Sequence, residues 1–334
     1  MNAVPSLSVV VCAYTLDRWW DIQAAIASVR SQNRSADDIV LVIDHCPELY
    51  RRARASLSGV RVVPNLQHKG LSGARNTGVA AALGQVVAFL DDDATADPAW
   101  TERLLAAYTD PTVVGVGGLV VAHWQTGRPE WFPAEFDWVV GCSYRGLPEH
   151  PAPVRNFIGA NMSFRRAELL AAGGFRTDLG RVGTRPLGCE ETELCLRITA
   201  RRPDAVLLYD PSAAVRHKVP GARARWAYFR KRCYAEGLSK ALVTRHSGSR
   251  AALASERTYL RSTIPYAFAR TLRPGRPAAL RTFAALSAGV GATVAGYAVG
   301  RVRAGRSVPE PHCPAPPGSA AAHHRVSTRE EATS

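Results

Sequence analysis

The stretch from Val86 to Trp100, VVAFLDDDATADPAW, joins an apolar run to three adjacent carboxylates, Asp91, Asp92 and Asp93. A short apolar run that stops abruptly is typical of a buried strand. Side chains alternate along a strand, so Asp91 and Asp93 are expected to point roughly the same way. Two such carboxylates suit Mg²⁺ or Mn²⁺, which in turn bridges phosphates. The alternative is a solvated acidic turn before the next helix.

Similar apolar runs lie on both sides of this stretch, and helical patterns separate them. Strands are predicted at residues 7–14, 39–45, 60–65, 85–93, 112–124 and 154–166 and within 205–219. Helices are predicted at residues 17–32, with Asp17 as N-cap, and at 70–84, 165–172 and 188–202. Strands that alternate with helices form βαβ units. We therefore expect an α/β fold in which helices cover both faces of a mostly parallel sheet.

The ends of several predicted strands carry polar side chains. In an open parallel sheet, ligands bind beyond the carboxyl ends of the strands. That rule places Tyr14 and Thr15, Asp44, Asn65 and the Asp91–Asp93 triplet along one edge. The sequence thus predicts one ligand site at this edge.

Charge divides the chain into two parts. The 334 residues, 46% of them hydrophobic, suffice for one large domain or two modest ones and carry a net charge of +14. Residues 1–220 are balanced, with 23 basic and 23 acidic side chains, and residues 221–334 hold 19 basic against 5 acidic. We expect a neutral catalytic body with a basic appendage that faces an anionic partner.

Beyond Pro220 the sequence changes character. Residues 221–281 are predicted to form a basic, mainly helical extension. Residues 282–300 carry no charged side chain but are rich in alanine and glycine, which gives the length of a membrane span with a weakly apolar composition. This segment either associates with a membrane or packs as a small-residue helix on the protein. The composition of residues 301–334 is typical of a disordered tail.

Cysteine usage and the N-terminus indicate a location. The seven cysteines include no C-x-x-C pair, which suits a reducing compartment. The N-terminal residues lack the basic region of a signal peptide. We predict a cytoplasmic protein, attached to the cytoplasmic face of a membrane if the alanine- and glycine-rich segment contacts lipid.

Six segments, in order, resemble family 2 of the GT-A-fold glycosyltransferases. They are VVVCAYTLDR, VIDHC, NLQHKGLSGARNTG, FLDDDATADPAW, GANMSFRRAELLAAGGF and CEETELCLR, and they extend over about residues 7–220. The resemblance implies a nucleotide-diphospho-sugar transferase domain at residues 1–220. It also implies an inverting, hexosyltransferase-type enzyme that uses a nucleotide-sugar donor and Mg²⁺ or Mn²⁺.

The resemblance assigns roles at the predicted edge. Asp91-x-Asp93 matches the metal motif of the family, and His217 matches a further metal ligand of some relatives; its alternative is an ordinary core or surface histidine. Asp92 is the member of the triplet expected to tolerate change. The implied donor-binding residues are Ala13, Tyr14, Thr15, Asp44, Arg75, Asn76, Asp91, Asp92, Gly159, Ala160 and Asn161. The alternatives are a strand-terminal turn for Asp44 and a helix-surface salt bridge for Arg75.

The catalytic base is expected on the helix at residues 188–202. Inverting transfer to a hydroxyl needs a carboxylate that removes the hydroxyl proton. Where the family has Glu-Asp, this chain has Glu190–Glu191, so Glu191 is the implied base and Glu190 its rival. Glu193 is expected to pair with Arg197 across one helical turn.

The sequence gives less information about the donor and the acceptor than about the site residues. The resemblance favours a uridine diphosphate sugar as donor and leaves the acceptor open between a glycan, a polyprenyl phosphate and a natural product. Aromatic residues of the insertion at 131–148 either stack on the acceptor or pack in the core. Two other classes compete: a nucleic-acid-binding module based on RARWAYFRKRCY (223–234), and a membrane-docked protein with an inert acidic edge. The balanced charge of residues 1–220 argues against nucleic acid, whereas an anionic membrane accounts for basic residues beside a weakly apolar segment.

Overall fold

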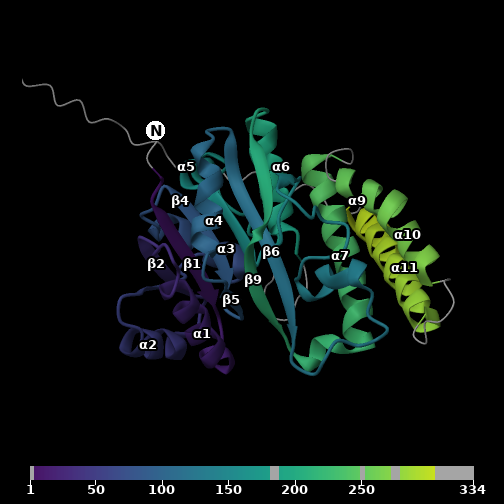
Figure 1. Cartoon of the computed structure of the whole chain (residues 1–334), viewed down its shortest axis with the longest axis horizontal. Coiled ribbons are helices and arrows are strands. Elements are labelled where there is room, and N and C mark those ends of the chain that lie inside the picture. The colour runs from purple at the N-terminus through teal and green to yellow at the C-terminus, as the bar shows by residue number, and fades with distance from the viewer. Residues whose placement is uncertain (1–3, 181–187, 249–252, 272–278, 305–334) are drawn as a thin grey trace, which may run out of the picture.

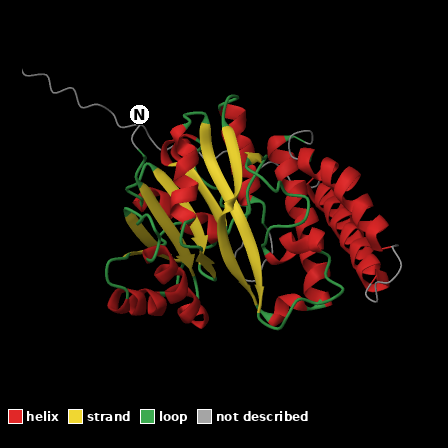
Figure 2. Ribbon diagram, viewed as in Figure 1, coloured by secondary structure: helices red, strands yellow, loops and turns green. Residues whose placement is uncertain are grey.

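The structure is a computed structural model that describes residues 4–180, 188–248, 253–271 and 279–304. Among these residues, nine strands form one sheet in the order β3-β2-β1-β4-β8-β6-β9-β5, with β7 paired to β9 (Figures 1 and 2). The strands are β1 (Leu7–Ala13), β2 (Asp38–Ile43), β3 (Arg61–Pro64), β4 (Val86–Asp91), β5 (Ala94–Ala96), β6 (Val113–Trp124), β7 (Ala152–Pro153), β8 (Asn161–Arg165) and β9 (Val206–Val219).

The sheet is mostly parallel, as predicted. β1 pairs in parallel with β2 and with β4 over six residue pairs each, and β6 pairs in parallel with β9 over ten. β8 is antiparallel to both β4 and β6, over five and three residue pairs. Because β1, β2 and β4 run the same way, their carboxyl ends meet at one edge of the sheet.

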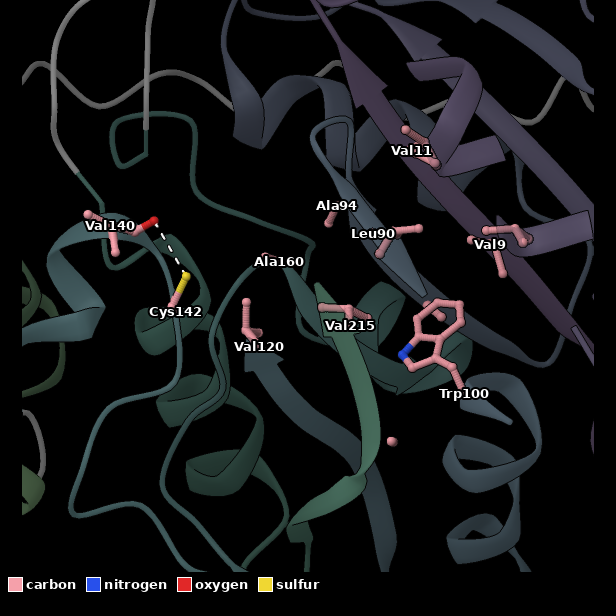
Figure 3. Close-up of a cluster of buried hydrophobic side chains, with 14 of the residues drawn as sticks. Val9, Val11, Leu90, Ala94, Trp100, Val120, Val140, Cys142, Ala160 and Val215 are labelled. Carbon is pink, nitrogen blue, oxygen red and sulfur yellow. Dashed lines mark hydrogen bonds between the residues drawn. The ribbon is translucent and has the colours of Figure 1, made fainter. Parts of the chain in front are cut away.

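Helices cover both faces of the sheet, which confirms the predicted α/β architecture. The helices are α1 (Trp19–Arg30), α2 (Pro47–Ser56), α3 (Leu71–Ala81), α4 (Trp100–Ala106), α5 (Arg166–Ala171) and α6 (Glu190–Arg201). One buried cluster packs α1, α2 and α4 against Val9 and Val11, and a second packs α3, α5 and α6 against Val10. Successive side chains of β1 therefore pack alternately into the two clusters. Both faces of this strand are buried, which is why its sequence is a continuous apolar run. Figure 3 shows part of the first cluster around Trp100 and Val215.

Some predicted boundaries are wrong. The strand expected at 154–166 is restricted to β8, because the chain before it turns, with the Asn161 N–H donating to the Ile158 carbonyl at 3.0 Å. The first helix begins at Trp19 after a 3₁₀ turn, so Asp17 is not its N-cap; the Thr15 hydroxyl instead accepts from the Asp17 N–H. α2 and β5 were not predicted, because only Leu49 and Ala53 of α2 are buried and β5 has three residues.

The C-terminal extension forms a helical layer beside the sheet (Figure 1). It comprises α7 (Trp226–Ser247), α9 (Ala254–Thr258), a π-helical segment (Tyr259–Thr263), α10 (Ile264–Thr271) and α11 (Ala279–Ala304). Residues 301–304 belong to α11, so the predicted tail does not begin at 301; its remainder, 305–334, lies outside the described residues.

Glycines bring α7 and α11 into close contact. A Cβ at Gly237 would lie 2.1 Å from the Thr293 carbonyl oxygen, and one at Gly296 would lie 2.0 Å from the Tyr234 carbonyl oxygen. The alanine- and glycine-rich segment thus packs on the protein through a small-residue face. Elsewhere on α11, Leu280 is 80% exposed and Val294 is 56% exposed. Residues 279–303 also have the length and hydropathy of a membrane-crossing helix, with 28% of the most apolar window buried.

Gly237→Ala is expected to lower the free energy of unfolding by about 1–3 kcal/mol, because the added methyl group would overlap the backbone of α11. Gly291→Ala is the matched control, since a Cβ at Gly291 meets nothing within 4 Å; it should be neutral or stabilise by up to about 1 kcal/mol. Urea unfolding of both variants measures the difference. Equal unfolding midpoints would contradict the close contact between α7 and α11.

Candidate active site

The acidic triplet begins at the end of β4, on the carboxyl edge of the parallel strands. Asp91, Asp93 and His217 each offer a ligand atom, and these atoms lie within 4.8 Å of one another. His217 comes from β9, where pairing with Ala94 of β5 places it, and its Nε2 lies 3.1 Å from Asp93 Oδ1. The outer two carboxylates thus lie close together, as predicted, but Asp92 and Asp93 form a turn after β4, so the turn and not strand alternation brings them together. Two carboxylates and an imidazole form a donor set that fits a divalent cation such as Mn²⁺ or Mg²⁺.

Asp93 is surrounded by positive charge. Arg18 Nη1 lies 3.2 Å and Arg223 Nη2 lies 3.6 Å from Asp93 Oδ2. Burial alone would raise the pKa of Asp93, but His217, Arg18 and Arg223 outweigh it and hold that pKa well below its usual range. The carboxylate is thus kept charged. Neither arginine was among the predicted site residues, although Arg18 lies within one of the segments that carry the family resemblance.

Asp92 is held inside the protein. Its Oδ1 accepts a hydrogen bond from Arg18 Nη1 at 2.5 Å, and the residue is 3% exposed. Burial raises the pKa of Asp92 to about 7, although Arg18 opposes this shift. The expectation that Asp92 tolerates change stays a prediction, but its contact gives Asp92 a structural task, which is to fix Arg18 beside Asp93.

Arg75 of α3 and Glu190 of α6 form a buried ion pair. Arg75 Nη1 lies 2.8 Å from Glu190 Oε1, and its Nη2 donates to the Gly159 carbonyl at 2.9 Å. The same Nη2 lies 3.6 Å from Asp91 Oδ1. Arg75 is 2% exposed, so a helix-surface salt bridge does not describe it. The guanidinium links the start of α6 to the acidic triplet.

The two glutamates at the start of α6 have different surroundings. Glu190 uses Oε1 for Arg75, and its buried Oε2 has no hydrogen-bond partner among the described residues. Burial, followed by the charge of Glu190, raises the pKa of Glu191 to about 8. A carboxylate whose pKa lies near neutrality is suited to proton transfer. Glu193 pairs with Arg197 through two contacts of 2.9 and 2.5 Å, as the helical spacing predicted.

The end of β2 is organised by Asp44. Its Oδ1 accepts from Asn65 Nδ2 at 2.7 Å, and its Oδ2 accepts from the Gly70 N–H at 2.9 Å. Asp44 and Asn65 therefore meet at the predicted edge. Tyr14 follows β1 at the same edge and is 49% exposed, with the Arg18 guanidinium 5.6 Å from its ring centre.

Two predicted donor-binding residues use their amide groups within the protein. Both amide atoms of Asn76 bond to the backbone of Phe175, at 2.8 and 2.7 Å. Asn161 accepts from Trp100 Nε1 at 2.8 Å and donates to the carbonyls of Leu119 and Ala213. These contacts give both asparagines structural roles, and their part in donor binding stays a prediction.

One cavity of about 400 Å³ joins the acidic triplet to α6 and to the C-terminal helices. The predicted residues that line it are Arg75, Asp91, Asp93, Gly159, Ala160, Glu190, Glu191 and His217. Ala13, Tyr14, Thr15, Asp44, Asn76, Asp92 and Asn161 do not line it. Side chains from α7, α9 and α11 complete the wall, so the basic extension is part of the site and not a separate appendage.

The aromatic insertion divides between core and cavity. Trp131 and Phe132 pack against Phe229 of α7, with ring centres 5.6 and 5.2 Å apart. Trp138 and Tyr144 line the cavity instead. Phe229 is fully buried and Trp226 stacks on it, so these two rings of α7 are engaged in packing within the protein.

A sheet edge with a carboxylate–histidine cluster, facing a cavity that also contains a carboxylate of raised pKa, fits a nucleotide-sugar glycosyltransferase of the GT-A fold. The profile of glycosyl transferase family 2 matches residues 8–170. The chain belongs to glycosyltransferase family 2, as the sequence motifs implied.

Relatives agree with this assignment, and a solved structure shares the fold. The chain is 36% identical over 241 residues to the glucosyl-dolichyl phosphate glucuronosyltransferase of Haloferax volcanii, a match that covers 71% of this chain and 77% of that protein. It is 28% identical over 195 residues to the pre-mycofactocin glycosyltransferase of Mycobacterium tuberculosis, with 58% and 39% covered. The mannosyltransferase PcManGT from Pyrobaculum calidifontis, solved with GDP-Man and Mn²⁺, shares the fold, with a TM-score of 0.55, 18% identity and 88% of each chain covered.

Proposed function

We propose that the protein transfers a sugar, with inversion, from a nucleotide-diphosphate donor to a hydroxyl group of a lipid-linked acceptor. The observation that carries this proposal is that the Asp91–Asp93–His217 cluster and Glu191 line one cavity. The lipid-linked acceptor is supported by the name of the Haloferax volcanii relative. Apolar side chains of α11 in the same cavity, Val290 and Val294, also support it.

The residues present fit a divalent cation at the acidic cluster. Asp91, Asp93 and His217 would hold it, and a bound cation would stabilise the negative charge of the departing diphosphate. Arg18 and Arg223 add positive charge at the same place. The Pyrobaculum calidifontis neighbour contains Mn²⁺, which supports Mn²⁺ or Mg²⁺ as the cofactor here.

Glu191 supplies the base. Its carboxylate takes the proton of the acceptor hydroxyl while the hydroxyl oxygen forms a bond to the anomeric carbon of the sugar. The bond between that carbon and the diphosphate oxygen breaks, and its electron pair leaves with the nucleotide. Glu190 Oε1 is held by Arg75 at 2.8 Å, so we assign Glu190 to orienting the arginine and Glu191 to the hydroxyl.

The direct test is a screen of UDP- and GDP-linked sugars for turnover in the presence and absence of Mn²⁺. We expect hydrolysis of one donor, with UDP-sugars the first candidates, and we expect chelation with EDTA to abolish it. Turnover that does not depend on the metal would contradict the proposal. The absence of turnover with every donor tested would also contradict it.

We also propose that the outer face of the C-terminal helices lies on an anionic membrane at its cytoplasmic side. This docking face consists of exposed apolar residues bordered by exposed arginines: Leu260, Tyr266, Leu280, Phe283, Val294 and Val302, with Arg257, Arg261, Arg281, Arg301 and Arg303. Figure 1 shows α10 and α11 on the side of the molecule away from β1 and β2. Arginines attract anionic lipid headgroups, and apolar side chains bury beneath them.

Leu280→Glu is expected to weaken binding to vesicles that contain phosphatidylglycerol by about tenfold, because the change removes a leucine that would enter the membrane and adds a charge that the anionic lipids repel. Leu280 is 80% exposed, so the fold should be unaffected. Leu83→Glu is the matched control, since Leu83 is 76% exposed and lies two residues after the end of α3. Vesicle co-sedimentation measures both variants, and equal losses in the two would contradict the assignment of this face.

A further inference from the structure

Part of the cavity wall carries a network of charged side chains that the proposed chemistry does not use. Lys240 Nζ of α7 lies 3.1 Å from Glu236 Oε1 and 2.6 Å from Glu256 Oε1. Arg155 bonds both carboxylate oxygens of Glu256, at 2.5 and 2.9 Å. Arg232 Nη2 lies 3.5 Å from Glu236 Oε2. We call these five residues the cationic network.

The cationic network holds three basic side chains and two carboxylates, so its net charge is +1. Its side chains are between 9% and 19% exposed, and all five line the cavity. Burial would lower the pKa of Lys240, but Glu236 and Glu256 outweigh it and raise that pKa, so the lysine stays charged. A cavity wall with a net positive charge attracts an anionic group of a ligand.

The cationic network adjoins the start of α6. Cys189, directly before Glu190, donates its thiol hydrogen to Glu236 Oε1, with Sγ 3.2 Å from that oxygen. The Gly188 N–H donates to Ser239 Oγ of α7 at 3.0 Å. An anion held by the network therefore lies close to the glutamate pair and close to a bound acceptor hydroxyl.

Apolar side chains continue the cavity towards the surface. Leu260, Val290, Val294 and Tyr297 line it, and Leu260 and Val294 are also exposed, at 45% and 56%. The same cavity thus offers a base, a cationic wall and an apolar outlet at the docking face. A ligand that satisfies all three has a hydroxyl, an anionic group and a hydrocarbon chain.

We propose that the cationic network binds a phosphate group of the acceptor, and that this phosphate joins a lipid chain to the sugar that accepts the new residue. The inference rests on the proposed function, because it assumes that Glu191 faces an acceptor hydroxyl. A phosphate monoester is already anionic and needs no base as a nucleophile. A base such as Glu191 is needed only if the nucleophile is a hydroxyl. We therefore assign the phosphate a binding role beside the reacting hydroxyl.

The test measures thermal stabilisation by farnesyl phosphate, used below its micellar concentration, with farnesol and inorganic phosphate as comparison ligands. We expect farnesyl phosphate alone to raise Tm saturably. Lys240→Met should weaken its Kd by at least about tenfold, the cost of a lost charge-assisted contact. Lys231→Met, which removes the same charge from an exposed position of α7, should leave the Kd unchanged.

Each other outcome overturns the inference. Equal stabilisation by inorganic phosphate would indicate a site for free phosphate, and equal stabilisation by farnesol would indicate an apolar site only. Equal losses in Lys240→Met and Lys231→Met would indicate unspecific attraction. If Lys240→Met does not fold, Arg232→Gln takes its place, with a loss of at least about fivefold expected.

This binding assay needs no nucleotide sugar, which separates the two proposals. Tight binding of farnesyl phosphate by a protein that turns over no donor would reject the proposed function and keep the phosphate site. Metal-dependent donor turnover by a protein that does not bind farnesyl phosphate would reject the phosphate site and keep the proposed function.

Discussion

Asp93→Asn is expected to lower kcat/KM for nucleotide-sugar turnover by about 10³-fold, close to the effect of deleting a charge-stabilising group in other enzymes. The carboxylate of Asp93 lies at the centre of the site, because His217, Arg18 and Arg223 are all within 3.6 Å of it. The amide keeps the size of the side chain but removes the charge that a cation needs. Turnover assays across a Mn²⁺ titration measure the loss, and titration of the variant with Mn²⁺ alone should show weakened metal binding.

Asp97→Asn is the matched control for this substitution. Asp97 lies four residues further along, and its side chain is 41% exposed beside Arg216, away from the cavity. We expect wild-type turnover in this variant. Full activity of Asp93→Asn, or an equal loss in Asp97→Asn, would remove the acidic cluster from the mechanism.

The parts of the site that could be predicted from the sequence are those formed by residues close together in the chain. The pair between Glu193 and Arg197 follows from helical spacing. The proximity of Asp91 and Asp93 was predicted from strand alternation, but a turn at Asp92 and Asp93 produces it. Both are local relations, separated by four and two residues. The parallel sheet was predictable for a similar reason, because β1, β2 and β4 are apolar runs that pack on both faces.

The remaining contacts join residues that are distant in the chain. Arg18 meets Asp92 across 74 residues, and Arg155 meets Glu256 across 101. His217 reaches Asp93 only because β5, a strand of three residues, pairs antiparallel with β9. No periodic pattern specifies such a pairing. The cationic network was not predicted for the same reason, because it joins Arg155 to residues 232–256 of the basic extension, which the sequence placed in a separate appendage.

The C-terminal extension combines two structural roles that its composition left as alternatives. Glycines of α11 allow it to approach α7 closely, and α7 in turn presents Lys240 and Glu236 to the cavity. Elsewhere, α11 exposes Leu280 and Val294. A helix that packs by small residues and also exposes larger apolar ones connects the proposed membrane face to the proposed acceptor site.

Glu191→Gln is expected to lower the rate of sugar transfer by about 10²–10⁴-fold, the usual contribution of a general base, while donor binding is retained. The raised pKa of Glu191, about 8, fixes the sign of the pH dependence. Transfer by the wild type should rise with pH until about 8 and then level off, because only the deprotonated carboxylate accepts the hydroxyl proton. The slow residual transfer of Glu191→Gln should lack this rise.

Glu190→Gln separates the base from its neighbour. This change weakens the pair with Arg75, whose Nη1 lies 2.8 Å from Glu190 Oε1, and it removes the negative charge that helps to raise the pKa of Glu191. The rise of transfer with pH should therefore remain in Glu190→Gln but shift to lower pH. If the rise instead vanished in Glu190→Gln and persisted in Glu191→Gln, the base would be Glu190, and the hydroxyl would have to approach from the side of Arg75.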